Sequence, residues 1–120
     1  MNNELINKII DLILSNEVEG IETIKKQRYN LTVKEMELVD NNKYITFDIK
    51  PGFEKADTSN FGVLSVMFWE LRKCIPIDCI LHFKDGYIHS LEVYSCDGSA
   101  FDDIDIENIN VAHTFPEIKF

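Results

Sequence analysis

The sequence predicts an α+β fold in which an antiparallel sheet of about four to six strands carries an amino-terminal amphipathic helix on one face. Three observations predict this fold. Apolar residues recur at helical spacing near the amino terminus, they alternate with polar residues through much of the remaining chain, and an Asp85-Gly86 turn separates two alternating segments. The 120 residues fall in the usual size range of one domain, so residues 1–120 are expected to form a single domain.

The amino-terminal segment 3–15 is predicted to be a helix. Glu4 and Asp11 interrupt its apolar residues and no basic region precedes it, so we interpret it as a helix and not as a signal peptide. A second, shorter helix is expected over residues 17–26. The apolar residues of the first helix fall on one side, at spacings of three and four: Leu5, Ile6, Ile9, Ile10, Ile13 and Leu14.

From Tyr29 the period of the apolar residues changes to two. Apolar side chains share one face over residues 29–33, and after a shift of phase Met36 and Leu38 carry it, which indicates a strand with a bulge. A turn at 40–42 and a second alternating segment at 44–49 predict a hairpin. The polar segment 53–60 is expected to be a loop.

The segment 61–71 fits two structures. Its apolar residues suit a buried helix, while alternation through Val63, Ser65, Met67 and Trp69 also suits a strand. We prefer the helix, and we expect Trp69 to lie in the core, because tryptophan is a mostly buried residue in a domain of this size.

A second hairpin is predicted from strands at 77–83 and 87–94. The turn between them contains Asp85 and Gly86, and glycine adopts positive φ without steric cost. A further tight turn is expected at 96–99. The segment 101–120 is predicted to form either a short helix or a last edge strand.

The second hairpin also carries a resemblance to known proteins. The sequence ILHFKDGYIHSLEVYS at 80–95, followed by Asp97-Gly98-Ser99, resembles a hairpin near the carboxyl end of small bacterial proteins. Some of these resemble immunity proteins that are encoded beside polymorphic or contact-dependent toxins. The resemblance implies a bacterial protein that neutralises a cognate toxin by binding it, and it carries over no catalytic residues.

The charge of the chain favours a basic protein partner. A net charge of −9, from 21 acidic and 12 basic residues, argues against nucleic acid, because binding phosphates requires clustered Lys and Arg. From residue 92 onward seven acids accompany a single base, Lys119, although such a segment can also serve only to keep the protein soluble. We expect a basic toxin domain to bind the following residues: Glu92, Tyr94, Asp97, Phe101, Asp102, Asp103, Asp105 and Glu107.

No motif in the sequence indicates a catalytic, cofactor or metal site. Cys79 and His82 have zinc-like spacing, but on one strand they would point to opposite faces. A Cys–His nucleophile would need a lowered thiol pKa, and the acids after residue 96 lack the order of a calcium loop. The alternatives to toxin inhibition are a small enzyme or ligand-binding domain that uses Cys79, His82 or His89 in a pocket between helix and sheet, and an adaptor subunit.

The location expected for the protein is the cytoplasm. Charges recur every few positions, so no apolar run is long enough to span a membrane, and a soluble protein is expected. The three cysteines form an odd set without the pattern of a secreted disulfide framework. The oligomeric state stays open.

Overall fold

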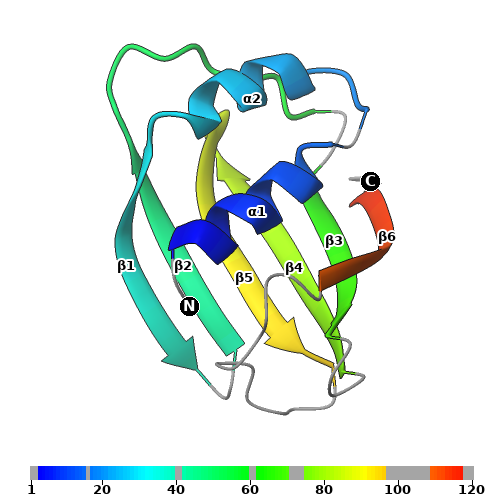
Figure 1. Ribbon diagram of the computed structural model, residues 1–120. Helices are drawn as coiled ribbons and strands as arrows, with labels where there is room; N and C mark the ends of the chain where they lie inside the picture. The colour runs from blue at the N-terminus through cyan, green and yellow to red at the C-terminus, as the bar shows by residue number, and fades with distance from the viewer. Residues whose placement is uncertain are drawn as a thin grey trace.

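The computed structural model describes residues 3–15, 17–39, 42–59, 62–70, 75–96 and 109–117. It contains two helices and six strands, and it confirms the predicted α+β fold (Figure 1). The helices are α1 (Asn3–Ile13) and α2 (Ile21–Arg28). The strands are β1 (Leu31–Val39), β2 (Asn42–Ile49), β3 (Val63–Glu70), β4 (Ile75–Lys84), β5 (Tyr87–Ser95) and β6 (Ile109–Glu117).

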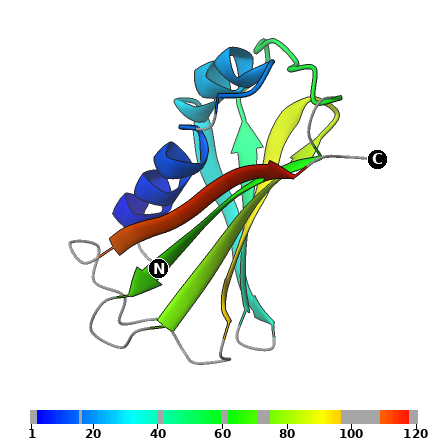
Figure 2. The ribbon, with the colours of Figure 1, turned by 90° about the vertical axis from the view of Figure 1, so that its right-hand side faces the viewer.

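The strands form one antiparallel sheet in the order β1-β2-β5-β4-β3-β6. Strands β1 and β6 are therefore its edges. Both helices lie on the same side of the sheet, and the other side carries no helix of the described chain (Figure 2). Neither helix in the described part of the chain is long and apolar enough to cross a membrane.

The core fills the space between the helices and one face of the sheet. All six apolar residues predicted for the first helix are buried, which confirms that helix and its buried side. Strand residues enter the core at alternate positions, as a sheet with one covered face requires. One row of fully buried residues crosses four neighbouring strands: Ile45, Leu91, Leu81 and Leu64.

The prediction of a helix over residues 61–71 is wrong, because residues 63–70 form strand β3. This strand pairs with β4 on one side and with β6 on the other, and it buries Leu64, Val66 and Phe68 at alternate positions. The helical spacing arose because Val63 and Met67, on the opposite face, are also apolar. An interior strand with apolar residues on both faces has no clean alternation, so it imitates a buried helix.

The other predicted strands, and the turn between β4 and β5, agree with the structure. The register of β1 against β2 shifts between Val33 and Glu35, which confirms the bulge. Positive φ values at Asp85 and Gly86 confirm the turn between β4 and β5, and residues 109–117 form an edge strand, one of the two structures expected there. Helix α2 covers Ile21–Arg28, later than the expected 17–26. The predicted turn residues 40–41 and 97–99 lie outside the described residues.

A buried glutamine joins α2 to the rest of the fold. Gln27 is fully buried, and its amide nitrogen donates to the carbonyls of Glu54 (3.0 Å) and Gly86 (2.9 Å). Its side-chain oxygen accepts from the backbone N–H of Ile88 at 2.9 Å. The Ala56 N–H also donates to the Gly86 carbonyl at 2.9 Å, and a Cβ at Gly86 would lie 2.8 Å from the Ala56 oxygen. One side chain therefore satisfies backbone groups from a loop and from a hairpin turn.

We predict that Gln27→Ala lowers the free energy of unfolding by about 3 kcal/mol, because it removes three hydrogen bonds and leaves the buried N–H of Ile88 without its acceptor. Urea denaturation followed by circular dichroism measures the change. Lys26→Ala, at the neighbouring exposed position, is the control and should change stability by less than about 0.5 kcal/mol. Equal stability of the two variants would contradict this role for Gln27.

Candidate functional site

The candidate site is the sheet face opposite the helices, which we call the open face. Residues that alternate with the buried row must point to this side, because successive side chains of a strand point to opposite faces. No helix of the described chain covers them (Figure 2). By register and alternation the central residues of the open face are Glu35, Glu37, Tyr44, Thr46, Ser65, Met67, Trp69, Asp78, Ile80, His82, Ser90, Glu92 and Tyr94.

A carboxylate held by two neighbours lies in the middle of this face. The Tyr44 hydroxyl donates to Oε2 of Glu92 at 3.1 Å, and Nε2 of His82 lies 3.3 Å from Oε1 of Glu92. The three residues come from β2, β5 and β4, which are adjacent in the sheet. The side chain of Glu92 is 19% exposed and that of His82 is 38% exposed. The carboxylate is thus fixed in orientation while part of it stays accessible.

A second polar pair lies one row further along the same strands. The Tyr94 hydroxyl donates to Oδ2 of Asp78 at 2.6 Å. This hydrogen bond, with burial and nearby negative charge, raises the pKa of Tyr94 well above its usual value. The other carboxylate oxygen of Asp78 is buried and has no hydrogen-bond partner within the described chain. The pair joins β4 to β5 at the cost of one buried acceptor that receives no donor.

Two of the predicted partner-binding residues, Glu92 and Tyr94, are described, and both lie on the open face of β5. The other predicted residues lie outside the described part of the chain: Asp97, Phe101, Asp102, Asp103, Asp105 and Glu107.

The residues that bond to Glu92 and Tyr94 were not among the predicted partner-binding residues. Tyr44 and Asp78 bond to them, and Glu35 and Glu37 extend the acidic character of the open face onto β1. Alternation from the buried residues of β2 would have placed Tyr44 on this face. The pairing of β2 with β5, which brings Tyr44 opposite Glu92, has no local signal because the two strands are far apart in the sequence.

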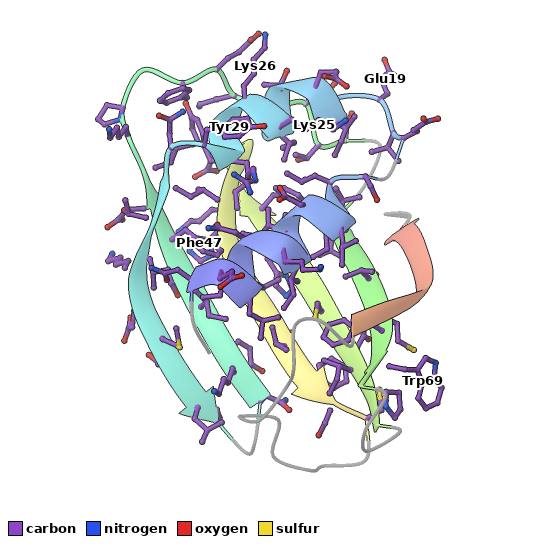
Figure 3. The ribbon with its side chains drawn as sticks, viewed as in Figure 1. Glu19, Lys25, Lys26, Tyr29, Phe47 and Trp69 are labelled. Atoms are coloured by element: carbon purple, nitrogen blue, oxygen red, sulfur yellow. The ribbon has the colours of Figure 1, made fainter. Side chains whose placement is uncertain are left out.

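The expectation that Trp69 lies in the core is wrong. Its side chain is 40% exposed, and it projects from the end of β3 away from the centre of the sheet (Figure 3). It pairs in register with Pro76 of β4, on the open-face side of the strand. The preceding residue, Phe68, points to the covered face and is fully buried there, so Trp69 points to the open face. The single tryptophan is therefore available at the surface.

The cysteine and histidines of the alternative hypotheses do not meet. Cys79 is fully buried on the covered face, whereas His82 lies on the open face, as the alternation predicted. Burial, with smaller contributions from Asp78 and Cys96, raises the pKa of the Cys79 thiol well above its usual value, which is the opposite of what a nucleophile needs. Among the described residues, no three side chains of His, Cys, Asp or Glu are placed to hold a metal ion.

We predict that Tyr94→Phe lowers stability by about 2 kcal/mol at neutral pH, since it leaves the buried carboxylate of Asp78 without its donor. The difference from the parent protein should shrink above about pH 10. There the unfolded tyrosine loses its proton while folded Tyr94, whose pKa is raised, keeps it, so the parent loses stability that the variant does not. Urea denaturation between neutral pH and pH 11 measures this, and a difference that grows with pH would contradict it.

We predict that Cys79 does not react with Ellman's reagent in the folded protein and reacts once urea unfolds it, because its thiol is fully buried. The measurement uses a variant in which Cys74 and Cys96 are replaced by serine. A variant that keeps only the exposed Cys96 is the control and should react while folded. Rapid labelling of folded Cys79 would show that the core opens at this point.

No protein-family model, curated protein or solved structure matches this chain. The interpretation of the open face therefore rests on its own residues.

Proposed function

We propose that the protein is an acidic protein-binding module, and that its open face binds the basic surface of a bacterial toxin and neutralises it. The observation that carries this proposal is the carboxylate of Glu92, held between Tyr44 and His82 at the centre of a sheet face that no helix of the described residues covers. Glu35, Glu37 and Asp78 add negative charge on the same face.

The arrangement suits recognition of a cationic side chain. A carboxylate whose orientation is already fixed loses little conformational entropy when an Arg or Lys binds it. The partly exposed Tyr44, Tyr94 and Trp69 offer the large, rigid side chains that carry much of the energy at protein interfaces. Opposite charge on the two surfaces speeds their encounter and disfavours acidic partners.

The resemblance at 80–95 supports a toxin as the partner. The resembling segment supplies three residues of the candidate site, namely His82, Glu92 and Tyr94. A toxin that acts on nucleic acid presents a basic surface to its substrate, so an acidic protein bound there would block access. Neutralisation of such a toxin would take place in the cytoplasm, where its substrate lies.

The proposal is tested with the protein encoded beside this one. Co-expression should relieve growth inhibition caused by that neighbour, and the two proteins should copurify. We expect Glu92→Gln, which keeps the shape of the side chain, to weaken the complex about tenfold and Glu92→Lys to abolish protection. Glu17→Lys, an equal charge change in the exposed loop between the helices, is the control and should protect fully.

Salt dependence separates the electrostatic part of the proposal from simple binding. The association rate should fall as ionic strength rises, and it should fall less steeply for Glu92→Gln. A triple substitution of Asp102, Asp103 and Asp105 by lysine should lower the association rate further if the acidic segment between β5 and β6 also meets the toxin. Full protection by Glu92→Lys, with an unchanged association rate, would refute the open face as the binding site.

A further inference from the structure

Strand β1 is an edge strand of the described sheet, and most of its residues are exposed. The strand is nine residues long, and eight of its residues are exposed. Within the described residues it pairs only with β2, so half of its backbone N–H and C=O groups point away from the sheet. After the bulge, residues 35–39 form a regular stretch in continuous register with β2.

An apolar row follows the covered-face side of this strand. Val33, Met36 and Leu38 pair in register with Phe47, Ile45 and Lys43, and they are 39%, 41% and 64% exposed. They are exposed because α1 packs on β3, β4 and β6 and does not extend over β1 (Figure 1). A row of large apolar side chains on a sheet edge promotes aggregation unless a partner covers it.

A groove continues this apolar row toward the first helix. Its volume is about 230 Å³, and it lies between α1 and the start of β1. Its apolar lining includes Ile6 and Ile10 of the helix and Val33 and Phe47 of the strands, and its polar lining comes from Asn3, Asn7 and Thr32. Phe47 points into this region between β2 and the helix (Figure 3). Apolar side chains of an added strand would have a pocket to enter here.

The open-face side of the same strand is acidic. Glu35 and Glu37 pair in register with Thr46 and Tyr44, and neither forms an ion pair with a base of the described chain. The two carboxyl groups interact with each other, and a hydrogen bond with Glu35, together with repulsion, raises the pKa of Glu37. A cation placed beside them would relieve that repulsion.

The acidic and the apolar side of β1 together indicate which kind of strand could pair with its free edge. A second copy of the chain fits poorly, because antiparallel pairing of two β1 strands would bring the glutamates of one copy against those of the other. We propose that the free edge of β1 binds an extended segment of a partner protein as an additional strand, with basic side chains facing Glu35 and Glu37 and apolar side chains facing Val33, Met36 and Leu38. Backbone hydrogen bonds supply affinity, and the alternation supplies specificity.

This inference goes beyond the proposed function, because it adds the backbone edge and the apolar side of β1 to the open face, with which it shares Glu35 and Glu37, and because it names an extended ligand. It does not require that the partner be a toxin or that Glu92 bind it.

The experiment uses a synthetic peptide as the probe. Acetyl-Lys-Val-Lys-Ile-Lys-Val-Lys-amide is titrated into the full isotope-labelled chain and followed by two-dimensional NMR. We expect saturable shifts of β1 amides with half-saturation below about 1 mM, and slower hydrogen exchange of those amides in the complex. The same peptide with glutamate in place of lysine should not bind, and a peptide N-methylated at alternate residues should lose binding because its strand edge is blocked.

Paired variants locate the site. Glu35→Lys with Glu37→Lys should weaken peptide binding at least tenfold, whereas the same charge change at exposed Glu17 and Glu54 should leave it within about twofold. Leu38→Lys should weaken binding without unfolding the protein, because Leu38 is largely exposed.

Three results would overturn the inference: no binding of the lysine peptide, shifts outside β1, or dimerisation of the chain alone through β1 in sedimentation experiments. Loss of toxin protection by Glu92→Lys with peptide binding intact would support both proposals separately. Intact protection without peptide binding would overturn this one alone.

Discussion

Both helices of the described chain cover the same face of the sheet, and the arrangement of the other described residues follows from that asymmetry. On the covered face, fully buried aliphatic residues of α1 pack against the row that crosses β2, β5, β4 and β3. On the open face, polar groups must bond to one another across strands or stay in contact with water. Tyr44, His82 and Glu92 do the first, as do Tyr94 and Asp78. The polar side chains that could bind a partner therefore lie on the face of the sheet that contributes least to the core.

Hydrogen bonds as well as apolar packing hold α2 against the covered face of the sheet. Helix α2 has only three buried residues, and one of them is Gln27. That side chain joins α2, the loop at Glu54 and the turn at Gly86, which are distant in sequence. Arg28 adds an exposed pair with Asp11 of α1. A polar anchor of this kind requires a specific geometry, so it selects one docked position for the short helix.

Local patterns predicted those elements whose two faces differ clearly. The first helix, the β1–β2 hairpin, the bulge and the β4–β5 turn all have one apolar and one polar side or a turn with Gly at a required position. Strand β3 was wrongly predicted as a helix because Met67 and Trp69 make its open face apolar as well, so its two faces do not differ clearly. Glu92 and Tyr94 were predicted as partner-binding residues from their charge and residue type, and this role stays a prediction. Their partners Tyr44 and Asp78 were not predicted, because strand order depends on packing between distant segments and has no short-range signature.

The bulge in β1 determines what each side of that edge presents. Lys34 is the additional residue, and on either side of it Val33 and Met36 still face the helices. In a strand of regular pleat the same sequence would turn Glu35 and Glu37 toward the helices, and it would turn Met36 and Leu38 to the open face. A bulge also bends its strand and increases the local twist, so a neighbouring strand would have to bend at residue 34 to follow the whole edge. The one additional residue, Lys34, therefore places the acidic and the apolar side chains of β1 on opposite faces, and it sets the curvature that any added strand must match.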